Sequence, residues 1–117
     1  MTDSDRARIH ALCAAMPGAE MSSPFGPGHD VWKVGGKIFA ILGVADAGIS
    51  IKCRDVEAAT LLIESGAAIK APYLHRSWVL IPFGAMPEDE LKQRIALSWQ
   101  IIASALPKKV QAALALS

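Results

Sequence analysis

The fold is decided by residues 30–44, which read DVWKVGGKIFAILGV. Two runs of strand-forming residues, 30–34 and 37–44, flank Gly35 and Gly36. A two-residue hairpin turn requires positive φ at its central positions, and glycine adopts such angles without strain. The stretch therefore predicts an antiparallel hairpin. Because the second run is apolar on both faces, we expect its strand to lie centrally in the sheet.

Residues 49–54 alternate between apolar side chains at the odd positions and serine, lysine or arginine at the even positions. This period of two predicts a further strand that turns one face inward and a basic face outward. Two short strands are expected at 69–71 and 78–81. The second is closed by Pro82, which cannot donate a backbone hydrogen bond to a neighbouring strand.

Three segments predict helices, at 4–16, 55–65 and 87–106. The second helix is capped by Asp55, whose carboxylate can accept from free backbone amides of the first turn. The third is the clearest, because Pro87 fits its first position and three acidic residues follow in its first turn. Its apolar residues repeat at helical spacing and form one stripe.

These elements predict an α+β fold with a single antiparallel meander sheet and helices packed on one face. At 117 residues the chain has the usual size of one domain, which we expect to cover residues 1–117. The apolar tail at 110–116 has the length for one or two further helical turns. The core is expected to contain Leu12, Phe39, Ile51, Leu62, Leu91, Ile95 and Ile102.

Composition narrows the class of protein. A hydrophobic content of 52% with 20% charged residues is typical of a globular chain and not of a disordered one. The net charge of +1 disfavours a protein that coats nucleic acid, because such proteins are far more basic. The longest apolar run, 38–45, is much shorter than the roughly 20 residues that span a bilayer. With no apolar signal sequence near its start, the chain is expected to be cytoplasmic and without membrane contact.

Few side chains suggest catalysis or metal binding. Cys13 and Cys53 lie forty positions apart without a CxxC pair, so we predict two buried free thiols. The histidines, His10, His29 and His75, fall on one helix and in two loops, and no HExxH or GxSxG motif accompanies them. We therefore predict no catalytic residue, no metal site and no cofactor, and we expect that the protein is not an enzyme.

Basic residues gather in two segments that are poor in acids. Residues 31–54 contain four basic side chains and one acidic, and residues 65–87 contain three basic side chains and no acidic one. Lys52 and Arg54 share a strand face, and two lysines bracket the hairpin tip. Cationic hairpins can contact phosphates; the alternative is ordinary solvated charge on an exposed sheet face. The candidate nucleic-acid-binding residues are Lys33, Lys37, Lys52, Arg54, His75 and Arg76.

Three stretches resemble the MmcQ/YjbR-like family: residues 16–26 (MPGAEMSSPFG), residues 31–53, which begin VWKVGGKIFA and end ISIKC, and residues 71–109, which include APYL, MPEDEL and LPKK. The resemblance covers nearly the whole chain in the expected order. It implies a frataxin-like α+β fold, also described as a double-wing architecture, and a DNA-binding role. Many family members carry a longer basic segment between the proline and the tryptophan, where this chain has only residues 73–77.

Two classes of function remain open. One is a nucleic-acid-binding module whose partner is DNA and whose contacts are weak and mainly to phosphates. The other is a non-enzymatic adaptor for a protein or small ligand, which uses the exposed sheet face or a groove lined by Phe25, Trp32 and Tyr73. The three tryptophans are expected to anchor the core, and Trp32 is the candidate for an exposed role. Salt dependence separates the two classes, because phosphate contacts release counterions. The sequence does not predict the oligomeric state.

Overall fold

The computed structural model describes residues 2–24, 29–43, 48–72 and 74–115. Within these ranges the chain forms four helices and six strands. The helices are α1 (Thr2–Ala14), α2 (Val56–Glu64), α3 (Glu88–Ser104) and α4 (Lys108–Ala115). The strands are β1 (Glu20–Ser22), β2 (Asp30–Val34), β3 (Lys37–Leu42), β4 (Gly48–Lys52), β5 (Ile69–Lys70) and β6 (Trp78–Pro82).

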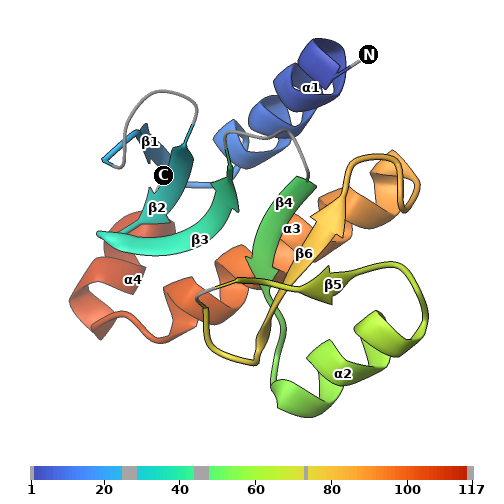
Figure 1. The fold of residues 1–117 in the computed structure, drawn as a ribbon. Helices are drawn as coiled ribbons and strands as arrows, with labels where there is room; N and C mark the ends of the chain where they lie inside the picture. Colours follow the sequence, from blue (N-terminus) through green and yellow to red (C-terminus); the bar gives the residue numbers. More distant parts are fainter. Residues whose placement is uncertain (1, 25–28, 44–47, 73, 116–117) are drawn as a thin grey trace.

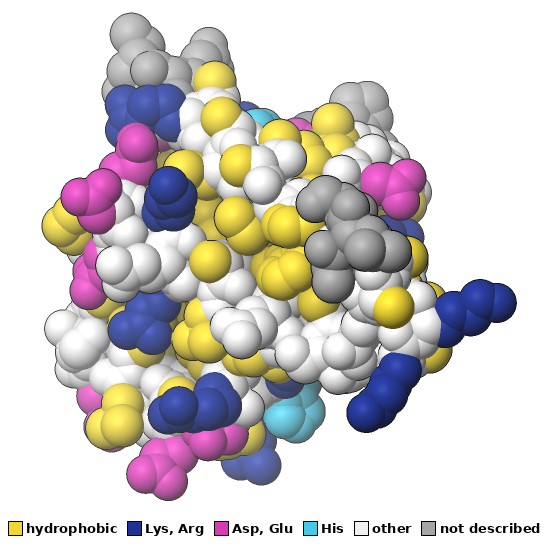
Figure 2. Space-filling view, turned by 180° about the vertical axis from the view of Figure 1, so that it is seen from behind, with side chains coloured by type: hydrophobic (Ala, Val, Ile, Leu, Met, Phe, Trp, Pro, Cys, Tyr) yellow, Lys and Arg dark blue, Asp and Glu magenta, His cyan; other side chains and the backbone are white. Residues whose placement is uncertain are grey.

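The strands form one sheet in the order β1-β2-β3-β4-β6-β5, and every neighbouring pair is antiparallel (Figure 1). Helix α3 packs across β2, β3 and β4, α1 packs against α3, and α2 lies against β6. Seen from the side of the helices, acidic and basic side chains are interspersed around apolar areas (Figure 2). The predicted α+β class with a single antiparallel sheet is confirmed, as is the central place of β3.

The hairpin turn forms as its sequence predicts. Gly35 and Gly36 have φ angles of 57° and 81°, which are the positive values that the tight turn requires. Asp55 also caps α2 as predicted, because its carboxylate accepts from the backbone amide of Ala58 at 2.7 Å. Pro87 differs from its prediction by one position, since it is the N-cap residue of α3 and not the first residue within the helix.

Strand β1 and helix α4 differ from the sequence prediction. Strand β1 was not predicted, because its three residues are all exposed and show no apolar alternation. The tail expected to add one or two turns instead begins its helix earlier, at Lys108. The predicted end of β3 at Val44 lies outside the described residues, and β3 itself ends at Leu42. None of the helices within the described ranges is both long and apolar enough to cross a membrane.

The two faces of the sheet have different environments. The strand register places Val31, Ile41, Ser50, Leu80 and Ile69 in one row across five strands. The four apolar members of this row lie outside the main hydrophobic cluster of the described residues. We call the side defined by this row the open face. Val31 and Ser50 are buried, whereas the other three side chains remain half-buried or exposed.

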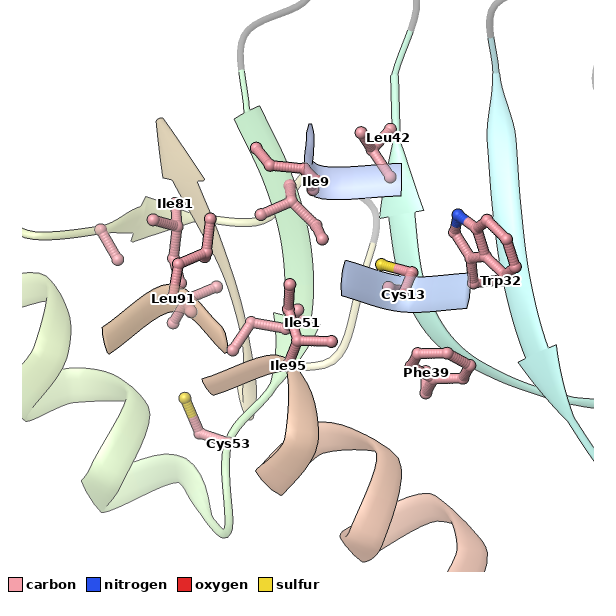
Figure 3. Packing of buried hydrophobic residues seen from close by; sticks show 14 of the residues in the cluster. Ile9, Cys13, Trp32, Phe39, Leu42, Ile51, Cys53, Ile81, Leu91 and Ile95 are labelled. Carbon is pink, nitrogen blue, oxygen red and sulfur yellow. The ribbon is translucent and has the colours of Figure 1, made fainter. Parts of the chain in front are cut away.

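The opposite face of the sheet carries the core (Figure 3). There Cys13 of α1 lies beside β3, Ile9 of α1 points toward β4, and Ile95 of α3 lies beside Ile51 of β4. Among the predicted core residues, Leu12 and Ile102 are only half-buried, where they pack at the margin of the cluster. The predicted core residues that are buried are Phe39, Ile51, Leu62, Leu91 and Ile95.

The two cysteines are buried free thiols, as predicted. Burial raises the pKa of Cys13 to about 12, because a thiolate loses its hydration in the core. Burial also raises the pKa of Cys53, although the positive charges of Arg94 and Lys52 oppose this shift. Both thiols are therefore held in their neutral, unreactive form.

A buried hydroxyl joins α3 to two strands. Ser98 is fully buried, and its Oγ donates to the carbonyl oxygen of Phe39 at 2.7 Å and accepts from the backbone amide of Lys52 at 2.9 Å. A β-bulge makes Phe39 an extra residue of β3 opposite β2. The β3–β4 pairing stops at Ala40 and Ile51, so it does not include the adjacent residues Phe39 and Lys52. Ser98 thus bridges two backbone groups at the place where the ladder opens.

Replacing Ser98 tests this bridge. Ser98→Ala leaves the Phe39 carbonyl and the Lys52 amide without their buried partner, so we expect the free energy of unfolding to fall by roughly 1–3 kcal/mol. Ser104→Ala, at an exposed position of the same helix, is the matched control and should change stability by less than about 0.5 kcal/mol. Urea denaturation measures both variants. Equal effects of the two substitutions would show that the bridge contributes no stability.

Candidate nucleic-acid interface

Four of the six predicted residues lie together at one corner of the sheet. Lys52 ends β4 and pairs in register with Trp78, the first residue of β6. Two residues after Lys52 comes the exposed Arg54, and the turn that leads into β6 contains His75 and Arg76, which are also exposed. We call Lys52, Arg54, His75 and Arg76 the basic corner.

Ser77 organises the basic corner from within. Its side chain is only 2% exposed. Lys52 Nζ donates to Ser77 Oγ at 2.6 Å, and His75 Nδ1 lies 2.8 Å from the same oxygen. The backbone amide of Ser77 also donates to His75 Nδ1 at 3.1 Å. That nitrogen is therefore an acceptor, which places the ring proton of neutral His75 on Nε2.

These contacts determine which group donates and which accepts in each hydrogen bond of the Ser77 hydroxyl. The hydroxyl donates to His75 Nδ1 and accepts from the Lys52 ammonium group, which satisfies both of its roles. The carbonyl oxygen of Ser77 accepts from the backbone amide of Cys53 at 2.7 Å, which extends the contact between the two strand ends. Ser77 was not predicted as a site residue, because a single serine before a strand has no distinguishing sequence pattern.

The charges of the basic corner are not neutralised by ion pairs with the described carboxylates. Within the described ranges, the ion pairs engage Arg6, Arg8 and His10, and none engages a member of the basic corner. Arg94 of α3 lies close enough to Cys53 to influence its pKa, so it adds positive charge nearby. Asp55 is the acid next in sequence, and its carboxylate is used to cap α2.

The two hairpin lysines lie apart from the basic corner. Lys33 is half-buried in β2, and it points to the open face because its neighbours Trp32 and Val34 both belong to the core. Lys52 points to the same face from β4, so one strand separates the two lysines. Lys37 is exposed at the start of β3. Lys37 pairs in register with the core residue Val34, so it lies on the opposite face of the sheet from Lys33 and Lys52. The structure thus does not bring the six predicted residues together on one face.

Trp32, the candidate for an exposed role, is a core residue instead. Trp32 is only 8% exposed, and its indole Nε1 donates to His10 Nδ1 at 3.0 Å. The alternation that sends Lys33 to the open face necessarily turns Trp32 into the core. Phe25 and Tyr73, which complete the groove expected for an adaptor, lie outside the described residues.

A second polar network, also missed by the sequence prediction, surrounds Asp30. Its Oδ2 accepts from Arg6 at 2.8 Å and from His10 Nε2 at 2.9 Å, while Ser23 Oγ donates to Oδ1 at 2.9 Å. Since the Trp32 indole donates to His10 Nδ1, both ring nitrogens of His10 are occupied. This histidine–aspartate pair therefore ties α1 to β2 and leaves no free nitrogen for proton transfer.

The hydrogen bond from Arg6 lowers the pKa of Asp30, although burial opposes the shift. A carboxyl with a lowered pKa in the folded state binds its proton more weakly there than in the unfolded chain. Its contribution to stability is therefore complete above the unfolded value of about 3.9, and it is lost as the pH falls below that value.

Asp30→Asn tests this network. At pH 7 we expect the variant to lose roughly 1–3 kcal/mol of unfolding free energy, because the charge-assisted bonds to Arg6 and His10 are weakened. The difference from the parent protein should shrink as the pH falls below about 4. Glu64→Gln removes an exposed carboxylate and serves as the control. Chemical denaturation across this pH range gives the comparison, and a constant difference would contradict the role of the Asp30 charge.

Among the described residues we find no candidate metal cluster, and the pocket beside α1 is small. These residues contain no group of three or more histidine, cysteine, aspartate or glutamate side chains arranged to hold a metal ion. A shallow pocket of about 70 Å³ lies between α1 and the start of α3, where Arg8 and Glu88 form a 2.9 Å ion pair. This volume holds about two water molecules and is too small for a cofactor.

Comparison with known proteins identifies the family. The YjbR family model matches residues 14–101, a range that contains the whole basic corner, and the chain belongs to this family. No curated protein matches significantly. The fold is similar to the crystal structure of Deinococcus radiodurans protein DR2400, a DUF419 domain, with a TM-score of 0.84 and 20% sequence identity. The match covers 96% of this chain and 88% of that one. The resemblance to the MmcQ/YjbR-like family is thereby confirmed.

Proposed function

We propose that this protein is a single-domain, non-enzymatic nucleic-acid-binding module that contacts the phosphate backbone through the basic corner. One observation carries the proposal: Ser77 holds the Lys52 ammonium group at 2.6 Å and the His75 ring at 2.8 Å, between two exposed arginines. Fixing these side chains in the free protein reduces the entropy lost when a phosphate binds.

The chemistry of the basic corner suits a phosphodiester. Lysine and arginine donate charge-assisted hydrogen bonds to phosphate oxygens, and His75 presents Nε2–H as a further donor. Lys33 adds positive charge from β2 on the open face, to which Lys52 also points. These groups contact the backbone and not the base edges, so they would bind different sequences alike.

Binding through so few charges is weak. The net charge of the whole chain is only +1, so long-range attraction to a polyanion is small. If about three to five phosphates are neutralised, the slope of the logarithm of the association constant against the logarithm of salt concentration is about −3 to −4 on duplex DNA. Contact through apolar groups alone would give a slope near zero.

Charge reversal at the basic corner tests the proposal. We expect the double variant Lys52→Glu/Arg54→Glu to lose affinity for duplex DNA at low salt, by a similar factor for unrelated sequences. The matched control is Lys92→Glu/Lys109→Glu, which makes the same charge change at exposed positions of α3 and α4 and should retain most of the affinity. Fluorescence anisotropy with a labelled duplex measures both variants.

Two results would contradict the proposal. One is the absence of binding by the parent protein at low salt. The other is an equal loss of affinity in both double variants, which would mean that net charge alone sets the binding. Either result would favour the alternative, a protein or small-ligand adaptor that uses the apolar open face.

A further inference from the structure

An aromatic side chain lies on the open face beside the basic corner. Trp78 pairs in register with Lys52. Along β6, Val79 and Ile81 are buried in the core cluster, so Trp78 and Leu80 point to the open face. Trp78 is half-buried and lies outside that cluster.

Trp78 differs from the other two tryptophans in its environment. The indole of Trp32 donates to His10 on the helix side, and that of Trp99 donates to the carbonyl oxygen of Pro17 at 2.9 Å. No hydrogen bond joins the Trp78 indole to any residue within the described ranges. A tryptophan that is part exposed and next to cations provides the two features that an unpaired nucleotide requires, a stacking surface and a charge partner.

The surroundings of Trp78 extend this surface. Leu80 and Ile41 are half-buried on the same face, and Ile69 at the sheet edge is 51% exposed. Lys52 on β4 and Lys33 on β2 border these apolar side chains, with β3 between the two lysines. A protein ligand would need matching acids beside its apolar residues, whereas a nucleic acid strand supplies anionic phosphates and flat bases at every step.

We propose that the basic corner takes single-stranded nucleic acid, with one base stacked on the Trp78 indole and the neighbouring phosphates bound by Lys52 and Arg76. This inference rests on the proposed function and narrows it. In a duplex the bases are paired and stacked on one another, so their faces cannot reach a side chain on a sheet. An unpaired base offers its face, and because every base has one, stacking selects for single strands with little preference for sequence.

Two substitutions of Trp78 separate stacking from packing. Trp78→Phe keeps an aromatic ring, whereas Trp78→Leu keeps an apolar side chain without a stacking plane. The probe is an oligothymidylate of about 12 nucleotides at low salt, compared with a duplex of similar length. We expect Trp78→Leu to weaken single-strand binding about tenfold and to leave duplex binding unchanged, while Trp78→Phe retains most of the single-strand affinity.

Tryptophan emission provides a second readout. Stacking on Trp78 should quench emission when the oligothymidylate binds to the parent protein. Trp32 and Trp99 are held by hydrogen bonds on the helix side, so the Trp78→Phe variant should bind the oligonucleotide without this quenching. If Trp78→Leu does not fold, the difference in quenching between the parent protein and Trp78→Phe tests whether a base stacks on Trp78.

The outcomes distinguish this inference from the function on which it rests. Stacking on Trp78 is refuted if duplex DNA binds more tightly than the single strand, if Trp78→Leu leaves single-strand affinity intact, or if quenching persists in Trp78→Phe. In each case, loss of duplex binding in Lys52→Glu/Arg54→Glu would still support phosphate contact at the basic corner. Failure of both probes to bind at low salt would refute both proposals.

Discussion

The buried Ser98 hydroxyl joins α3 to β3 and β4 through two hydrogen bonds to their backbones. It occupies the point where the β3–β4 ladder opens, and it satisfies one backbone group from each strand. Lys52 has its amide bound there while its side chain reaches Ser77 on the open face. Lys52 is therefore held at both ends, by Ser98 at its backbone and by Ser77 at its ammonium group. The same Ser77 hydroxyl also hydrogen-bonds to His75.

The Asp30 network ties α1 to β2 at the other end of the structure. Arg6 and His10 draw α1 onto β2 from the core side, where α3 already packs across the central strands. With α1 and α3 on one side of the sheet, the row from Val31 to Ile69 is left to the open face. Apolar side chains and lysines therefore meet there, which is the combination used in the proposal for single-stranded nucleic acid.

The sequence was sufficient for local structure and insufficient for the polar contacts. The hairpin and the cap at Asp55 follow from rules that act over a few residues, and both were confirmed. The strand predicted from the alternation of residues 49–54 forms as β4, but it ends at Lys52, and Ser50 on its predicted outer face is buried. Ser98 bonds to groups 59 and 46 positions away, and Lys52 meets Ser77 across 25 positions. No periodicity encodes such pairs, because each depends on how complete elements pack. The burial of Trp32 was missed for the same reason, because its hydrogen-bond partner His10 lies on α1 and could not be inferred from the hairpin alone.

In the proposed function, the basic corner, held in place by Ser77, is the surface that contacts nucleic acid. Amide chemical-shift mapping by NMR, with an isotope-labelled protein titrated with a short oligonucleotide, tests this contact. We expect shifts concentrated at residues 52–54 and 75–78 that diminish as salt is added, because the contacts release counterions. Shifts confined to α1 or α4, or shifts that do not change with salt, would contradict the proposal.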